Sequence, residues 1–383
     1  MEEKNITNSI KNIDLSSNNF NSENCELCKG KWNSYVNLLK SAFLAIEKLN
    51  NNLQKKITIG IATTIHIDLA INENFFLDKI NISTKTLINL IIKEKIKQFD
   101  KFIMSIQPQN AQLMLTIDFV SNNYVISNNP VFILAKYNKY SRNICQNIWF
   151  CEKCYRKGCE NCNYTGVKYE SIAAICERGI KKIMKIKKFF LHANGREDVD
   201  VRTLGNGRYC VLEFKPTKFY ETIDLTSLEN AINEEGSKFG IKLKLIKIVN
   251  RSFLNVVTES EFDKHYKAIV KTERTINEND LINLNNRLIY TTISQRTPLR
   301  VAKRRADLIR KKTIKEVNCE LIDEHTFIMK VKCQSGTYVK ELIHGDKGRT
   351  KPSVSEILNT KAECVELDIE KFEDHFIELF IKN

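Results

Sequence analysis

Two hydrophobic periods run through the first third of the chain. Apolar residues recur at helical spacing over residues 33–50 and from about residue 84 to residue 99, which predicts two amphipathic helices. Every second residue is apolar over most of 57–71 and over 113–119, as in half-buried strands. The apolar run VFILAKY at 131–137 predicts a further strand. These segments together predict a small α/β domain.

The second half of the chain mixes strand-like and helical segments in irregular order. A basic stretch at 177–190 predicts a helix, as do two shorter segments at 226–235 and 338–344. Strand-like segments follow the pattern of alternating apolar residues at 208–215, 241–249, 265–271, 286–294 and 326–334. A doubly wound parallel sheet would need regular alternation of strands and helices. The order therefore favours an α+β fold.

The length and composition predict a soluble protein with more than one domain. The chain has 383 residues, of which 42% are hydrophobic and 28% charged, and this length exceeds what one ordinary core organises. A membrane span needs about 18 or more consecutive apolar residues, and the sequence has no such run. Residues 1–24 are polar and acidic from the start, so we expect a flexible N-terminus and no signal peptide. We expect a cytoplasmic protein.

The charge of the chain favours a polyanionic partner. Lysine and arginine outnumber acids 60 to 46, a net charge of +14, and each phosphate that such a surface neutralises releases counterions. A generally basic surface without a partner is the alternative. The distribution favours a nucleic acid, because residues 296–315 hold nine basic residues and one acid, Asp307.

The twelve cysteines favour metal ligands and buried thiols over disulfides. Two CxxC pairs, Cys151 with Cys154 and Cys159 with Cys162, offer four thiolates for a structural zinc ion. The short spacing between the pairs could prevent all four from binding one ion, and reduced structural thiols are the alternative. A third pair, Cys25 and Cys28, needs two further ligands if it binds metal.

Acids and arginines are concentrated in the segment GREDVDVR at 195–202, before TLGNGR at 203–208. An arginine beside a carboxylate lowers its pKa, and an ionised carboxylate can act as nucleophile or general base. As a pattern alone, a solvated loop with salt bridges explains the segment better. A phosphate-binding loop at Gly205–Gly207 is disfavoured because no helix-forming segment follows.

Four segments in order resemble the motifs of pseudouridine synthases: GREDVDVRTLGNGR, HYKAIV, QRTPLRVAKRR and CQSGTYVKELIHGDKGRT. The set closely resembles the archaeal-type "pseudouridine synthase ten" (Pus ten) family, which acts on the T arm of tRNA. NNPVFILAKYNKYSR and the cysteine-rich IWFCEKCYRKGCENCNYTGVKYES resemble upstream parts of that family. The resemblance extends from about residue 120 to about residue 365. The chain departs from the pattern at Lys303, where the family usually carries histidine.

The resemblance implies a fold and a domain order. It implies a THUMP-containing RNA-binding domain at 25–150, a cysteine-rich zinc linker at 151–166 and a catalytic domain at 167–383 with a mixed, mainly antiparallel sheet. It implies a tRNA partner, isomerisation of uridine 54 or 55 or both, and no catalytic cofactor, nucleotide cofactor or membrane.

The resemblance also implies roles for charged residues. Asp198 stands at the position of the nucleophile, and Lys340 at that of the basic residue that keeps it charged. Arg196 is a further candidate partner of phosphate or carboxylate. If the segment is extended, the side chain of Asp200 points away from that of Asp198, and we expect Asp200 to be structural.

Substrate contacts are implied for two tyrosines and part of the basic run. Tyr266 stands where the family has an active-site tyrosine that stacks on the uracil, and Tyr338 at a second contact position. A core tyrosine is the alternative for Tyr266. Arg304 and Arg305 are expected to hold phosphates of the tRNA backbone.

Two other functions are compatible with these motifs, and a third is disfavoured. The same isomerase could act on another RNA site, because these motifs indicate the reaction better than the target. The chain could be a catalytically silent tRNA-binding protein with THUMP and zinc elements. A THUMP-bearing methyltransferase or thiolation enzyme would need a glycine-rich nucleotide loop after a strand, and the sequence has none.

Overall fold

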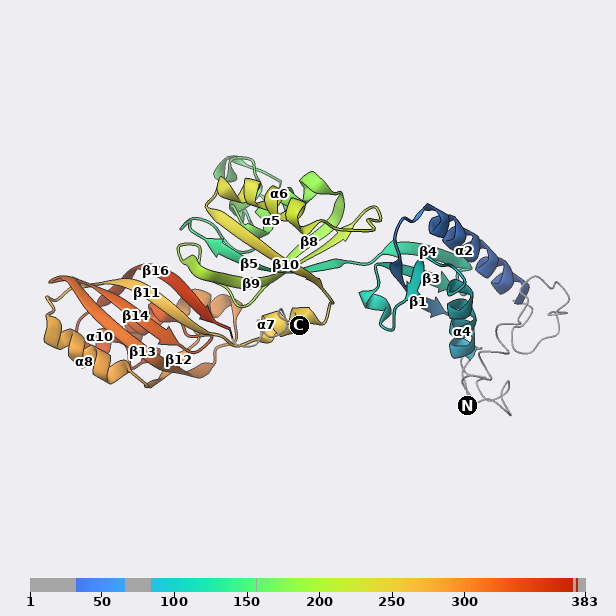
Figure 1. Cartoon of the computed structure of the whole chain (residues 1–383). Coiled ribbons are helices and arrows are strands. Elements are labelled where there is room, and N and C mark those ends of the chain that lie inside the picture. The colour runs from blue at the N-terminus through green and yellow to red at the C-terminus, as the bar shows by residue number, and fades with distance from the viewer. Residues whose placement is uncertain (1–31, 66–83, 156, 375–376, 378–383) are drawn as a thin grey trace. The chain divides into compact units, whose positions relative to one another are not determined.

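The computed structural model describes residues 32–65, 84–155, 157–374 and 377, which divide into two compact units (Figure 1). The first unit holds the described residues up to Val131 with two short later segments, Ile186–Lys188 and Phe214–Ile223. The second unit holds the rest. The boundary at Val131 precedes the expected end of the N-terminal domain at residue 150. No helix within the described ranges has the length and apolarity to cross a membrane.

The first unit is a four-stranded sheet packed against two helices. Strand order is β2-β1-β3-β4, with β1 parallel to β2 and β3, and β4 antiparallel to β3. The elements are α2 (Trp32–Asn52), β1 (Ile57–Thr64), α4 (Thr84–Ile96), β2 (Phe102–Met104), η1 (Pro108–Asn110), β3 (Leu113–Asp118) and β4 (Asn123–Asn128). The predicted α/β organisation of this part is confirmed.

The second unit is built on one long mixed sheet. Its order is β10-β5-β9-β16-β11-β14-β13-β12-β15, with β8 beside β9. The strands are β5 (Val131–Lys139), β8 (Ile186–Ala193), β9 (Arg202–Pro216), β10 (Ile241–Val249), β11 (Asp263–Thr272), β12 (Thr292–Arg296), β13 (Ile309–Asp323), β14 (Thr326–Cys333), β15 (Thr350–Lys351) and β16 (Ala362–Glu373). Strand β16 runs parallel to β9, and every pair from β16 through to β15 is antiparallel. The predicted α+β class is confirmed.

Two of the predicted segments contain residues of another type of element. The expected helix at 177–190 is α5 (Ile172–Ile183), and strand β8 starts three residues later. Residues 286–288, expected in a strand, end helix α8 (Glu278–Leu288). Asn277 and Asp280 form a capping box that starts this helix, a local signal that the strand-like pattern concealed.

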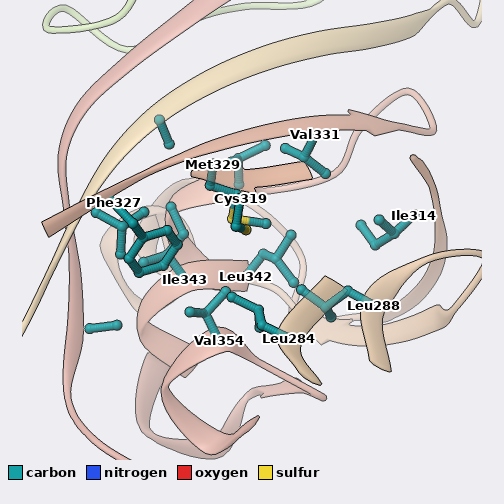
Figure 2. Packing of buried hydrophobic residues seen from close by; sticks show 14 of the residues in the cluster. Leu284, Leu288, Ile314, Cys319, Phe327, Met329, Val331, Leu342, Ile343 and Val354 are labelled. Atoms are coloured by element: carbon teal, nitrogen blue, oxygen red, sulfur yellow. The ribbon is translucent and has the colours of Figure 1, made fainter. Parts of the chain in front are cut away.

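Short helices pack against the part of the long sheet that extends from β16 to β15. They are α8, α9 (Val339–His344) and α10 (Val354–Ile357). Figure 2 shows Leu342 and Ile343 of α9 packed with residues of α8, α10 and β14. Both side chains are fully buried. Helix α9 is therefore fixed on the sheet, and so is the polar loop at its N-terminus. The remaining helices are α6 (Leu225–Ser237) and α7 (Phe253–Glu259).

Candidate active site

The segment between β8 and β9 forms a turn that presents Asp198. The backbone amide of Val201 donates to the carbonyl oxygen of Asp198 at 3.2 Å. The preceding Glu197 is directed inward, where its carboxylate pairs with the fully buried Arg208 at 2.8 Å. The hydroxyl of Tyr137 donates to Glu197 at 2.9 Å. With Glu197 fixed in the interior, the Asp198 carboxylate remains 37% exposed.

Two cations contact the Asp198 carboxylate. Arg300 donates to Oδ1 at 2.8 Å, and the ammonium of Lys340 lies 3.6 Å from Oδ2. Arg300 also donates to the buried carboxylate of Glu341 at 2.7 Å. Burial opposes the charge of Arg300, but Glu341 and Asp198 raise its pKa above the ordinary value. Arg300 is therefore a permanent cation beside Asp198.

Arg300 and Glu341 are site residues that sequence reasoning missed. Arg300 lies in η3 (Leu299–Arg304) and Glu341 in α9. Arg300 is the last residue of the motif QRTPLR, but the sequence identifies it only as one of the nine basic residues of the segment 296–315. Glu341 directly follows Lys340, and its partner is 41 residues away in the chain. No local pattern indicates such a pairing.

The expected separation of Asp200 from Asp198 is wrong. Because the chain turns at Asp198, one ammonium, that of Lys340, reaches both carboxylates, at 2.6 Å from Asp200 and 3.6 Å from Asp198. Burial raises the pKa of Asp200, but the hydrogen bond and charge of Lys340 lower it overall. Asp200 therefore holds Lys340 in place instead of facing away.

The two predicted tyrosines belong to different elements of the same unit. Tyr266 lies on β11, between Val331 of β14 and Ile369 of β16, and is partly buried. Burial, with added contributions from nearby anions including Asp198, raises the pKa of Tyr266 above its ordinary value. Its phenol is therefore neutral at physiological pH.

Tyr338 is held by its backbone at the start of α9. Its amide donates to Gln295 Oε1 at 2.9 Å, and Gln295 Nε2 donates back to the Tyr338 carbonyl at 3.0 Å. Arg305 donates to the Tyr338 hydroxyl at 3.3 Å. These contacts bring Arg305, one of the predicted phosphate-binding residues, next to a predicted substrate-binding tyrosine.

Arg196 contacts an aromatic ring upstream of the turn. Its guanidinium lies over the ring of Trp149, 4.9 Å from the centroid. Among the ion pairs of the described residues, none joins Arg196 to Asp198. The side chain of Arg304 lies outside the described part of the chain, as do Cys25 and Cys28.

Some basic residues of the segment 296–315 form ion pairs with acidic residues of the protein. Arg296 pairs with Asp307 at 2.6 Å, and Lys315 pairs with Asp263. The described contacts include no ion pair for Arg305, Lys311 or Lys312, and Arg305 and Lys311 are exposed. These side chains can therefore donate hydrogen bonds to a phosphate of a bound partner.

The four cysteines at 151–162 converge on one point. They lie around η2 (Glu160–Cys162), between strands β6 (Trp149–Phe150) and β7 (Val167–Tyr169). The four sulfur atoms lie within 4.8 Å of one another, and three pairs are 3.7 to 3.8 Å apart. A tetrahedral ion with metal–sulfur bonds of about 2.3 Å holds its ligands about 3.8 Å apart. The cluster could therefore hold a metal ion, and the short spacing does not prevent it.

The backbone supports thiolate ligands in this cluster. Amides of Cys159 and Gly166 donate to the Cys162 sulfur at 3.2 and 3.3 Å. Burial opposes ionisation of Cys162, but these bonds, together with the side chains of Cys154 and Cys159, lower its pKa to about 6. Gly158 has a φ of +84°, and a Cβ there would lie 2.7 Å from the Tyr164 carbonyl oxygen. The tight turn between the two CxxC pairs therefore requires glycine.

A family model described as "Pus10, C-terminal" matches residues 132–373, which is more than half of the chain. The chain belongs to the Pus10 family. The matched range starts at β5 and ends with β16, so it covers the long sheet and every site residue described above.

Curated relatives share the family name. "tRNA pseudouridine synthase Pus10" of Methanosphaera stadtmanae is 41% identical over 256 residues, covering 66% of this chain and 62% of that protein. Its namesake in Korarchaeum cryptofilum is 33% identical over 368 residues, covering 95% of this chain and 96% of that protein. Human Pus10 is 35% identical over 244 residues, covering 63% of this chain and 44% of that protein.

Coverage of the relatives is uneven. The chain spans 62%, 58% and 52% of the relatives from Methanosphaera stadtmanae, Methanocaldococcus jannaschii and Methanococcus voltae. Among solved structures, "Crystal Structure of a Cbf5-Nop10-Gar1 Complex" covers 63% of this chain and 48% of its own at 17% identity, with a TM-score of 0.30.

The contact of Lys340 with Asp200 predicts that the pKa of Asp200 changes measurably when Lys340 is replaced. Lys340→Met removes the ammonium, so the pKa of Asp200 should rise toward the ordinary value of about 3.9. When folding lowers the pKa of a carboxylate, the charged carboxylate stabilises the folded protein at pH values above the pKa of the unfolded state. This stabilisation is lost as the pH falls through the pKa of the folded state. The variant should therefore be less stable than wild type at neutral pH, with the difference closing below about pH 4.

Carboxyl titration by NMR with 13C-labelled aspartate measures the pKa, and urea unfolding at several pH values measures stability. Lys332→Met is the matched control, because Lys332 pairs with Glu373 at 2.9 Å and not with the aspartates of the turn. An unchanged Asp200 titration in Lys340→Met would contradict the role given to this ion pair.

Proposed function

We propose that this protein is a tRNA pseudouridine synthase that isomerises uridine 54, uridine 55 or both in the T arm, with Asp198 as nucleophile. The observation that carries the proposal is the partly exposed Asp198 carboxylate between Arg300 and Lys340, at 2.8 and 3.6 Å. Membership of the Pus10 family and the names of its relatives support the reaction and the tRNA substrate.

The chemistry needs only the carboxylate and the substrate. Asp198 attacks C1′ of the uridine, and the bond from C1′ to N1 breaks, with its electrons staying on the base. The uracil turns, C5 attacks C1′ and Asp198 leaves. The proton on C5 is lost and N1 gains a proton, so the product is an isomer. The first step uses the ionised carboxylate as nucleophile, and Arg300 and Lys340 lie beside it at 2.8 and 3.6 Å.

In this proposal the two tyrosines bind the uracil base and do not take part in breaking the bond between C1′ and N1. A neutral Tyr266 offers a flat ring on which a flipped uracil stacks, as aromatic rings do for splayed bases. Tyr338, fixed through Gln295 at 2.9 and 3.0 Å, supplies a second contact of defined position. Arg305, which donates to the Tyr338 hydroxyl, connects this contact with the phosphate-binding residues.

The first unit and the cysteine cluster complete the proposal. We assign the first unit to RNA binding as the THUMP-containing domain, and we expect a cytoplasmic enzyme. We assign zinc to the cluster of Cys151, Cys154, Cys159 and Cys162, because four thiolates at tetrahedral spacing suit that ion. The zinc would stabilise the fold and take no part in the reaction.

Replacement of Asp198 tests the nucleophile. Asp198→Asn nearly preserves shape and removes the charge, so tRNA binding should persist while turnover falls by about 10⁴-fold or more, as for other lost nucleophiles. Pseudouridine mapping of unmodified tRNA measures the product and its position. Wild type should also form an adduct or altered product with 5-fluorouridine tRNA, and Asp198→Asn should not.

Asp200→Asn is the matched comparison. It keeps the nucleophile and releases Lys340, so it should lower turnover far less. Near-normal turnover by Asp198→Asn would reject the assignment, and loss of activity in Asp200→Asn alone would transfer it to Asp200. Pseudouridine at another position, or none from wild-type protein that binds tRNA, would favour a different RNA target or a silent binding protein.

The RNA-binding surface has its own test. Reversing Arg305 and Lys311 to Glu removes two side chains that carry no ion pair within the described contacts. Binding of tRNA should weaken, and the slope of log affinity against log salt should fall by about 1 for each phosphate that the protein no longer binds. Lys271→Glu on β11 reverses an exposed charge outside the run and should change neither. Salt-independent binding would place the RNA elsewhere.

Metal analysis tests the zinc. Purified protein should contain about one zinc ion per four-thiolate cluster. Cys162→Ser should lose the metal and melt at lower temperature. Cys176→Ser, at a buried cysteine of α5 away from the cluster, should keep the metal. Wild-type protein that is folded and free of metal would reject the assignment.

A further inference from the structure

A lysine is completely buried beneath the Asp198 turn. Lys139, the last residue of β5, has no exposed surface. Its ammonium donates to the carbonyl oxygens of Ile144 at 2.8 Å, Asp198 at 3.0 Å and Val199 at 2.8 Å. An ammonium has three donors, and all three are used. Among the described contacts, no carboxylate shares them.

The charge of Lys139 is costly to the fold. Burial lowers its pKa to about 8, and the nearby carboxylates of Glu197, Asp200 and Asp198 offset burial only in part. Folding must therefore work against this charge below about pH 8, where it is fully present. An apolar side chain at this strand position would avoid that cost but would leave these three carbonyl oxygens without their common donor, so the lysine serves the turn and not the strand.

The neighbours of Lys139 show what the segment does. Tyr137 donates to Glu197 at 2.9 Å, Gln146 to the Gly195 carbonyl at 3.0 Å and Arg142 to the Asp200 carbonyl at 3.0 Å. Residues 137–146 thus hold the turn at several points along its length. Lys139 alone among them holds the carbonyls of Asp198 and of the following residue.

These two carbonyls determine where the Asp198 side chain points. The Asp198 carbonyl oxygen accepts one hydrogen bond from the Lys139 ammonium and one from the Val201 amide. These two bonds use both of its lone pairs. The peptide plane after Asp198 is then fixed, and with it the direction from Cα to the carboxylate.

We propose that Lys139 is a positioning residue for the reaction, and that it holds the Asp198 turn so that the carboxylate meets both its cations and the uridine C1′. The proposal rests on the proposed function in which Asp198 is the nucleophile. Lys139 has no exposed surface and does not touch the substrate, so it acts through the backbone of Asp198.

Lys139→Met tests this role, because methionine fills similar volume without the donors. Displacing a reacting group by about 1 Å can lower a rate about 100-fold, so turnover should fall by about that factor with KM and Kd for tRNA within about twofold of wild type. Hydrogen exchange of residues 195–201 should become faster. Adduct formation with 5-fluorouridine tRNA should slow but persist, unlike in Asp198→Asn.

Lys264→Met is the matched control. Lys264 is a second buried lysine of the same unit, with a pKa lowered by burial to about 8, and it donates to the Phe262 carbonyl and the Ser335 hydroxyl. Its loss reports the cost of removing any buried lysine and should leave exchange of residues 195–201 unchanged. Its turnover should remain well above that of Lys139→Met.

Three results would decide against Lys139. Normal turnover in a folded Lys139→Met protein, equal losses in both lysine variants, or a loss confined to KM would each overturn the positioning role. If Lys139→Met does not fold, turnover of Lys264→Met must still fall as pH rises through about 8, where Lys139 loses a proton, and a flat profile would overturn the proposal. Full activity in Asp198→Asn would instead reject the nucleophile itself.

Discussion

The buried ion pair between Glu197 and Arg208 is the constraint on which the site depends. Both side chains are 1% exposed, and their charged groups are 2.8 Å apart. Removing one partner of such a pair typically costs about 3–5 kcal/mol, because the other charge stays buried. The pair fixes Glu197 in the interior, so the next residue, Asp198, must turn outward. Both partners belong to the motif GREDVDVRTLGNGR, which therefore positions its own aspartate.

A second layer of charge then fixes the environment of that aspartate. Arg300 joins Asp198 to the buried Glu341, and Lys340 joins Asp198 to Asp200. Each cation is thus held by one carboxylate other than that of Asp198. Because Glu341 is buried and Asp200 binds Lys340 at 2.6 Å, each cation is held beside Asp198 by a second contact. Helix α9, packed as Figure 2 shows, carries two of these residues on a rigid base.

The sequence predicted features that depend on local patterns. Periodicity gave the helix at 33–50 and the strands of the first unit, because burial on one face imposes a period. The CxxC spacing predicted the four-cysteine cluster. Prediction failed where distant segments meet. The turn at Asp198 is closed by Lys139, 59 residues earlier, so the local assumption of an extended chain separated Asp200 from Asp198. Arg300 and Glu341 were missed for the same reason.

The place of β5 in the fold follows from the same contacts. The sequence assigned residues up to 150 to the N-terminal domain, but β5 pairs with β10 in the long sheet, and its last residue lies under the Asp198 turn. The segment that holds the turn therefore precedes the cysteine cluster in the chain, whereas the turn itself follows it. The cluster lies within the connection between the two. A fold of this order makes the geometry of Asp198 depend on residues on both sides of the cluster.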